Sequence, residues 1–246
     1  MPFDVSRFSD RRIEWYASLG STMTRAAELA RQGCAAGTVV GADEQTAGIG
    51  RQGHRWHSET ETGLYVSIVL RLPMHAGDLP LLMLMLGLAA QEAIVEASGL
   101  AADLRWPNDV LIRGKKCAGI LAQLEGEAII AGIGINVGHT SFPAEIAALA
   151  TSLAIEGARV KREDLLAGLL DAIDQHSNIL EEQGAEAILR MFTRASSYAE
   201  GRRVRVDKDG ATIEGITCGL DESGFLVVRE DNGKETTILA GGVRPA

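Results

Sequence analysis

The sequence changes its pattern near residues 197–201, and this change constrains the fold more than any other feature. Beyond it, residues 203–238 form a series of short segments in which apolar and polar residues alternate, as in strands with one buried face. The turns between these segments carry Asp-Gly, Ser-Gly and Asn-Gly pairs, which are typical of hairpins. We therefore expect two domains, a main body over residues 1–198 and a small β-barrel over residues 199–246.

The main body mixes helix and strand patterns. Residues 163–182 repeat apolar side chains every three to four positions, which predicts a helix with one buried face. Residues 64–70 read LYVSIVL and are rich in β-branched and apolar side chains, as strands are. Further helices are expected at residues 22–31, 81–98 and 185–196. Further strands are expected at residues 38–42, 103–106, 109–112, 117–124 and 128–137.

The most apolar run covers residues 79–90 and contains no charged residue. A membrane-spanning helix needs about 20 such residues, so the run predicts a helix buried in the protein core. The N-terminal segment carries charges throughout and lacks the apolar centre of a signal peptide. We therefore expect a cytoplasmic protein that does not associate with a membrane.

The composition excludes several classes of protein. A formal net charge of −9 argues against general binding to nucleic acid or to an anionic membrane. A hydrophobic fraction of 46% is too high for a disordered chain. Cys34, Cys117 and Cys218 are far apart in the sequence, so we expect neither a disulfide framework nor a zinc site.

A basic, glycine-rich segment interrupts this acidic sequence at residues 48–57. It reads GIGRQGHRWH and holds two arginines and two histidines but no acid. The backbone N–H groups of a glycine-rich loop, together with guanidinium groups, bind phosphate or carboxylate. A solvated surface loop has the same composition, so the segment alone leaves both interpretations open.

A second basic cluster lies at residues 105–119, with four basic residues and one acid. Asn108 and Asp109 are natural turn residues, but an aspartate that faces a lysine across a short hairpin also suits a site for a metal-bound nucleotide. Lys116 stands at the start of an apolar segment that is expected to form a buried strand. Its ammonium group is held rigidly there and can bind phosphate oxygens. Lys115 fits a solvated turn better.

Two glycines, Gly132 and Gly134, interrupt a strand pattern, and glycines in strands often mark the close approach of a ligand or of another backbone. Asn136 follows among apolar neighbours. Its amide needs a partner, either within the protein or on a ligand edge such as that of a purine.

Taken in chain order, these motifs form one set: Gly20-Ser21-Thr22, residues 48–57, Trp106-Pro107-Asn108-Asp109, Lys116-Cys117-Ala118-Gly119-Ile120-Leu121 and Gly132-Ile133-Gly134-Ile135-Asn136. The set closely resembles the bacterial biotin protein ligases over nearly the whole chain. The resemblance implies an α+β fold, with a mixed sheet and flanking helices similar to the catalytic domains of class II aminoacyl-tRNA synthetases. A C-terminal SH3-like β-barrel follows, so that residues 1–198 form the catalytic domain and residues 199–246 the SH3-like domain.

The resemblance also implies a reaction in two steps. The carboxylate of biotin attacks the α-phosphate of Mg-ATP and gives biotinyl-5′-AMP and pyrophosphate. A lysine amine of a biotin carboxyl carrier protein or domain then attacks this mixed anhydride and releases AMP. ATP, Mg²⁺ and biotin are the implied cofactors and substrates. No enzyme nucleophile is required, and the sequence has no recognisable Ser/His/Asp or Cys/His arrangement.

The residues that match the family's motifs take their roles from the resemblance. The polar end of biotin is bound by Ser21, Thr22 and Gln45. The loop that closes on the adenylate contains Gly48, Ile49, Gly50 and Arg51. The biotin pocket is lined by Gly119, Ile120 and Leu121. Nucleotide binding is assigned to Arg51, Trp56, Asn108, Lys116 and Asn136, with Asn136 on adenine. The four loop residues and Lys116 are also assigned to biotin binding, with Lys116 on the biotin carboxylate as well as on the α-phosphate. Lys116 and Arg51 are the candidate catalytic residues, and Asp109 is the candidate Mg²⁺ ligand.

Four positions depart from the family's usual pattern. Ile49 and His54 stand where the loop usually has arginines, Met23 stands where asparagine is common, and Arg105 stands where lysine is frequent. The two missing loop charges bear on the retention of the intermediate more than on the class of reaction.

Two alternative functions remain, a lipoate or octanoate protein ligase with the same catalytic fold and a biotin sensor without catalysis. The Trp-Pro-Asn-Asp motif and the C-terminal tail favour biotin ligation. Repressors of the family carry an N-terminal winged helix, whereas this sequence starts at the catalytic domain, so we expect no DNA binding. Members of the family can form homodimers by sheet extension, and the sequence leaves the oligomeric state open.

Overall fold

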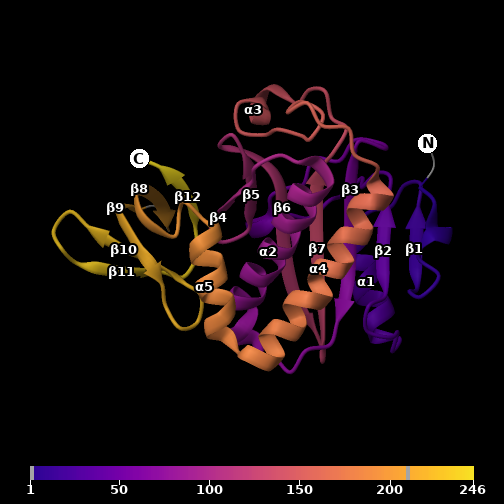
Figure 1. Cartoon of the computed structure of the whole chain (residues 1–246), viewed down its shortest axis with the longest axis horizontal. Coiled ribbons are helices and arrows are strands. Elements are labelled where there is room, and N and C mark those ends of the chain that lie inside the picture. The colour runs from indigo at the N-terminus through magenta and orange to yellow at the C-terminus, as the bar shows by residue number, and fades with distance from the viewer. Residues whose placement is uncertain (1–2, 209–210) are drawn as a thin grey trace.

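The computed structural model describes residues 3–208 and 211–246 and contains two β-sheets, the first of which is covered by helices (Figure 1). The first sheet has the strand order β1-β2-β3-β7-β6-β5-β4, and its neighbours are antiparallel except for the parallel pair β1 and β2. Its strands are β1 (Ile13–Tyr16), β2 (Val39–Ala42), β3 (Gly63–Leu70), β4 (Asp103–Arg105), β5 (Asp109–Ile112), β6 (Lys115–Glu125) and β7 (Ala128–Asn136). The mixed sheet expected from the sequence is confirmed.

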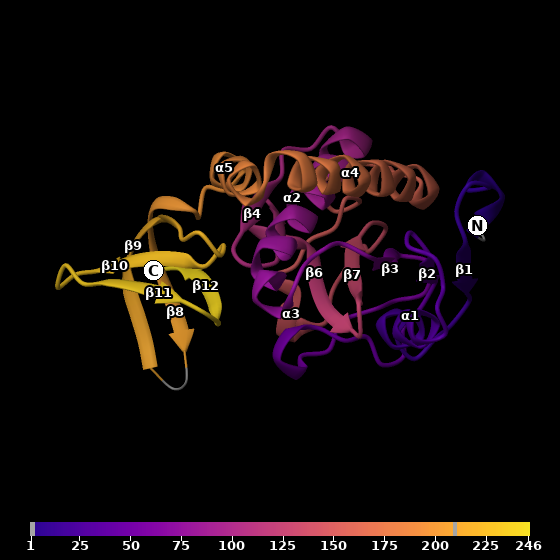
Figure 2. The same cartoon turned by 90° about the horizontal axis from the view of Figure 1, so that it is seen from below.

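Helices cover both faces of this sheet (Figure 2). One face packs against α2 (Leu79–Ser98), α4 (Arg162–Gln183) and α5 (Ala185–Ala195), and the other face packs against α1 (Thr22–Arg31). Neighbouring residues of one strand serve opposite faces, as the pleat requires. Val39 thus belongs to the core under α2, while Val40 packs with α1. The short helices are α3 (Ala144–Ala147), η1 (Val5–Arg7), η2 (Arg51–Gly53) and η3 (Ala76–Asp78).

Residues Ala76–Ser98 are long and apolar enough to cross a membrane by length and composition alone. In the structure, however, α2 packs against the first sheet and against α4 and α5, and most of its apolar side chains are buried there. It ends at Gly99, whose φ of 69° lies in the left-handed region that glycine adopts easily. The buried core helix predicted from the sequence is confirmed.

The second sheet lies at the C-terminus and is antiparallel throughout, in the order β11-β10-β9-β8-β12. Its strands are β8 (Glu200–Lys208), β9 (Ala211–Leu220), β10 (Leu226–Glu230), β11 (Glu235–Ile238) and β12 (Gly242–Pro245). The Ser223-Gly224 and Asn232-Gly233 turns lie between strands as expected, while the Asp209-Gly210 turn lies outside the described residues. Trp106 Nε1 donates to the Gly224 carbonyl at 2.9 Å and so ties this sheet to the main body.

The sequence did not predict β1 or β12, and both are edge strands of their sheets. The residues of β1 are all only partly buried, so the strand shows no clear alternation. The four residues of β12 include a glycine and end at Pro245, which a central strand does not tolerate but an edge strand does.

Candidate functional site

A pocket opens on the α1 face of the first sheet, and the space between its lining residues, open solvent included, is about 450 Å³. Its wall is built by strands β3, β6 and β7, the start of α1, the segment after β2 and the residue just before β5. It is lined by Thr22, Met23, Gln45, Ile49, Gly50, Arg51, Trp56, Val66, Asn108, Lys116, Gly119, Ile120, Leu121, Gly132, Ile133 and Gly134. Most residues singled out in the sequence therefore meet in one place. Ser21, Gly48, Asp109 and Asn136 lie around the pocket or beyond it.

The floor of the pocket is made by glycines. Gly119 of β6 and Gly134 of β7 are paired across the sheet, and the Trp56 ring lies against both. A Cβ atom would lie 2.7 Å from Trp56 Cζ3 at Gly119 and 2.5 Å from Trp56 Cε2 at Gly134. The close approach expected at the strand glycines is thus made by this indole. Its Nε1 is buried without a hydrogen-bond partner among the described residues, so it is a donor in need of an acceptor.

The basic segment over the pocket is a small hairpin. Trp56 N donates to Gly48 O at 3.0 Å, and Gly50 N donates to His54 O at 2.7 Å. At the tip of the hairpin, Gln52 and the glycine after it both have positive φ. The sequence suggested an irregular loop instead, because a glycine-rich stretch has no readable strand period. The hairpin brings Arg51 to the pocket, where its Nη1 donates to Asn108 Oδ1 at 3.2 Å.

A polar group of side chains gathers at the N-terminal end of α1. Thr22 N and Thr22 Oγ1 donate to Gln45 Oε1 at 2.9 and 3.0 Å, and Ser67 Oγ donates to Thr22 Oγ1 at 2.8 Å. Ser21 is the N-cap residue of α1, but its side chain makes no capping bond. Its hydroxyl is buried and has no partner in the part of the chain that the structure describes. This end of the pocket therefore offers an unused hydroxyl beside fixed amide and hydroxyl groups.

The charged centre of the site is a cluster of Lys116, Asp109 and Arg105. Lys116 Nζ pairs with Asp109 Oδ1, and Arg105 Nη2 donates to Asp109 Oδ2 at 2.6 Å. Burial alone raises the pKa of Asp109, but the two cations outweigh it and hold this pKa below its usual range. Arg51 adds a further positive charge, although burial lowers its pKa, because arginine remains protonated in proteins. The site is therefore positive within an acidic protein.

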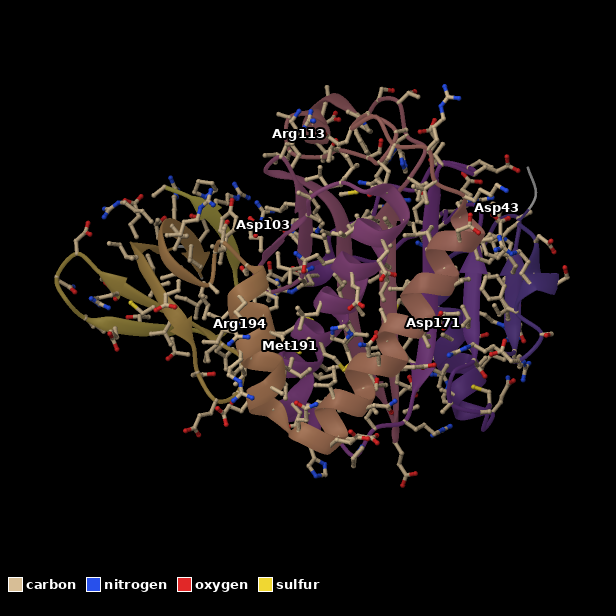
Figure 3. The ribbon with its side chains drawn as sticks, viewed as in Figure 1. Asp43, Asp103, Arg113, Asp171, Met191 and Arg194 are labelled. Atoms are coloured by element: carbon tan, nitrogen blue, oxygen red, sulfur yellow. The ribbon has the colours of Figure 1, made fainter. Side chains whose placement is uncertain are left out.

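Both carboxylate oxygens of Asp109 are engaged by these cations, which favours a role in positioning Lys116. Its role as a Mg²⁺ ligand stays a prediction. The sequence analysis counted Arg105 in the basic cluster and as a departure from a family pattern but gave it no role, although its spacing of four residues from Asp109 was a usable signal. Arg113, from the same basic cluster, lies instead at the β5–β6 turn beside α3 (Figure 3), 3.4 Å from Glu156.

Asn108 and Asn136 are placed differently. Asn108 lines the pocket, and its Nδ2 donates to the Ile120 carbonyl at 3.0 Å, so the side chain links Arg51 to β6. Asn136 is buried at the end of β7, and its Nδ2 donates to the Thr151 carbonyl at 3.0 Å. Because this amide donor already has a backbone partner, the adenine contact of Asn136 stays a prediction.

A buried ion pair fixes the beginning of the segment that crosses the pocket. Arg162 Nη1 of α4 lies 2.7 Å from Asp43 Oδ1, which also accepts from Trp15 Nε1 at 3.1 Å. Figure 3 labels Asp43 close to the start of α4. The pair anchors the chain two residues before Gln45.

Comparison with known proteins gives consistent results. Residues 15–139 match the model of the biotin/lipoate A/B protein ligase family, and residues 201–243 match the biotin protein ligase C-terminal domain. The chain is 34% identical to the bifunctional ligase/repressor BirA of Bacillus subtilis, over 91% of this chain and 71% of that protein. It is also 34% identical to a biotin–[acetyl-CoA-carboxylase] ligase of Mycobacterium tuberculosis, over 94% and 88%. The crystallised biotin protein ligase of Aquifex aeolicus in complex with biotin and ATP superposes with a TM-score of 0.85 at 32% identity, covering 96% of this chain and 99% of that one.

Proposed function

This chain belongs to the biotin/lipoate A/B protein ligase family, and on that premise we propose that it attaches biotin to a lysine of a carrier protein in an ATP-dependent reaction through biotinyl-5′-AMP. One observation carries the proposal. A single pocket joins two cationic side chains, Lys116 and Arg51, to a glycine floor and a fixed polar end. The similarity to an Aquifex aeolicus ligase in complex with biotin and ATP supports the same assignment.

Biotin has an apolar ring system with a polar ureido group at one end and a carboxylate at the other. We assign the ureido end to Ser21, Thr22 and Gln45, because the free Ser21 hydroxyl lies beside an already ordered pair. The apolar part of biotin fits against Ile120 and Leu121, which line the pocket. The carboxylate then points toward Lys116.

The first step joins a carboxylate to a phosphate, and both are anions that repel each other. A carboxylate oxygen of biotin forms a bond to the α-phosphorus while the bond from that phosphorus to the bridging oxygen breaks, and the electron pair leaves with pyrophosphate. Lys116 and Arg51 lower the barrier by offsetting the charge that builds on the phosphate oxygens. Asp109 and Arg105 hold the Lys116 ammonium in place.

The second step needs an acceptor amine and a dry intermediate. The neutral amine nitrogen of the carrier lysine attacks the acyl carbon, the bond from that carbon to the AMP oxygen breaks and its electron pair leaves with AMP, and the nitrogen loses a proton to solvent. The hairpin that carries Arg51 and Trp56 covers the pocket, so it shields the anhydride from water until the carrier arrives. Mg²⁺ enters bound to ATP, as part of the substrate.

The acceptor that fits this reaction is a biotin carboxyl carrier protein or domain, in keeping with the names of the Mycobacterium tuberculosis and Paracoccus denitrificans relatives. We propose a cytoplasmic location, where ATP and such carriers occur together. For a homodimer formed by sheet extension, the edges of the first sheet are β1 and β4.

Exchange of labelled pyrophosphate into ATP tests the proposal. We expect exchange that depends on biotin and that lipoate and octanoate do not support. Exchange with lipoate or octanoate but not with biotin contradicts the substrate. Binding of biotin and ATP without any exchange contradicts the enzymatic function and indicates a sensor.

A further inference from the structure

A second cluster of polar side chains lies outside the pocket, on the chain just after Trp56. It consists of His57, Glu59 and His139, and one potential ligand atom from each residue lies within 4.8 Å of the other two. His57 and Glu59 follow the hairpin, whereas His139 comes shortly after β7. The proposed biotinylation uses none of the three.

One nitrogen of this cluster has no hydrogen-bond partner within residues 3–208 and 211–246. His139 is fully buried, and its Nδ1 makes no hydrogen bond to any residue that the structure describes. Its other ring nitrogen, Nε2, lies 3.2 Å from Tyr65 Oη. A buried imidazole nitrogen without a partner is unfavourable, and such groups call for a specific explanation.

The hydrogen bonds around Tyr65 indicate which nitrogen of His139 carries the proton. Tyr65 Oη lies 3.3 Å from the Glu59 carbonyl, which can only accept, so the hydroxyl hydrogen has a partner there. In that arrangement His139 Nε2–H donates to Tyr65 Oη, which also accepts from Glu59 N at 3.1 Å. His139 Nδ1 is then left with a free lone pair, the form in which histidine binds metals.

Neighbouring groups hold the rings and leave a route for an ion. The His139 ring stacks on Phe142, with the ring centroids 5.0 Å apart and an angle of 17° between the ring planes. The His57 ring centroid lies 5.8 Å from that of His139. A wide hollow of about 410 Å³ opens beside His57 and Glu59 and is also lined by Glu44. It provides an entry path from solvent to the cluster.

We propose that His57, Glu59 and His139 form a binding site for a divalent transition metal ion, with Zn²⁺ as the first candidate. Two imidazoles and one carboxylate are an established zinc ligand set that leaves a fourth position for water. In tetrahedral coordination with metal–ligand distances of ~2.1 Å, the ligand atoms lie roughly 3.4 Å from one another. The three side chains must therefore move closer together when the ion binds. Glu59 is exposed and free to rotate toward the ion. The Tyr65 hydroxyl orients the buried ligand from behind, as outer groups of zinc sites do.

The position of the site gives the ion a structural role. A metal at this point joins the chain directly after Trp56 to the segment that follows β7. Ser58 lies between His57 and Glu59 in the sequence, and its Oγ accepts a hydrogen bond from Gln45 N at 2.7 Å. Metal binding therefore stiffens the segment that carries both the indole on the pocket floor and a residue of the polar end.

The test uses the full chain, stripped of metal, without biotin or ATP, so that its result is independent of the proposed function. Zn²⁺ is titrated against a chromophoric chelator, and Co²⁺ serves as a spectroscopic probe of coordination number. The variants are His57→Ala, at a partly buried position, and Glu59→Gln, at an exposed one, and far-UV circular dichroism confirms that they are folded. His54→Ala is the matched control, because His54 is exposed on the same segment and lies outside the cluster.

We expect one tightly bound Zn²⁺ per chain and a four-coordinate Co²⁺ spectrum. His57→Ala should lose affinity by about 100-fold or more, because even the loss of an outer partner typically costs 10–100-fold. Glu59→Gln should also lose affinity, and His54→Ala should bind as the unmodified chain does. Equal affinity in all four proteins, or no stoichiometric binding to the unmodified chain, overturns the proposal.

Discussion

Replacing Lys116 with methionine removes one ammonium group from the pocket and keeps a side chain of similar length. In the structure this ammonium pairs with Asp109 and lies 5.4 Å from the centroid of the Trp56 ring. Loss of one well-placed group that stabilises transition-state charge typically costs about 2.7–4 kcal/mol, a factor of roughly 10²–10³ in kcat. We expect a loss of this size in adenylation.

The same change also perturbs the fold, and the size of this effect follows from the geometry. Asp109 loses one of its two cationic partners, but Arg105 remains 2.6 Å away. Removing one partner of a fully buried pair costs about 3–5 kcal/mol, whereas exposed pairs contribute roughly 0–1 kcal/mol. Because the Lys116 side chain is 30% exposed and Arg105 stays, we expect a loss of about 1–2 kcal/mol in the free energy of unfolding.

Biotin-dependent pyrophosphate exchange, measured beside urea unfolding, separates the two effects. Lys115→Met is the matched control, because Lys115 is the exposed neighbour and does not line the pocket. It should keep its exchange rate. A folded Lys116→Met protein with nearly normal exchange would refute the electrostatic role of this lysine.

Three further predictions follow from the same site. Arg51→Ala should release biotinyl-5′-AMP to bulk amines, because the hairpin loses its hydrogen bond to Asn108. Free adenylate is measured by chromatography, and full retention of the adenylate contradicts closure by this residue. Gly134→Ala places a methyl group 2.5 Å from the Trp56 ring, so the ring must move. The affinity for biotin should therefore fall by about tenfold or more, and unchanged binding in calorimetry argues against a glycine floor. The pKa of Asp109 lies below 3.8 in the folded protein, so its stabilising effect is complete above about pH 4 and is lost as the pH falls through that lower pKa. Asp109→Asn should flatten the loss of stability as the pH falls below about pH 4, and an unchanged slope in urea unfolding excludes this carboxylate as its source.

The sequence predicted those parts of the fold that have a clear period. Helix α2 and strand β3 have no such period and were recognised instead as apolar runs. The amphipathic helix α4 presents one buried face over many residues. Edge strands β1 and β12 lack such a face and were missed. The hairpin over the pocket was also missed, since its conformation depends on a few backbone bonds and on the packing of Trp56.

The candidate site was predictable as a set of residues but not as a geometry. Its motifs are local, and the basic residues stand out in an acidic chain. The contact of Trp56 with Gly119 and Gly134 depends on the register of β6 against β7, which no local pattern reveals. The same is true of His57 and His139, which are far apart in the sequence and meet only through the pairing of β3 with β7.

The central claim is that this pocket makes an activated biotin and transfers it to a carrier lysine. The most direct measurement is the intact mass of a biotin carboxyl carrier domain after incubation with this protein, ATP and equal amounts of biotin, lipoate and octanoate. The account predicts a gain of one biotinyl group at the acceptor lysine, dependent on ATP. An unmodified carrier, or one that carries lipoyl or octanoyl groups instead, would contradict it.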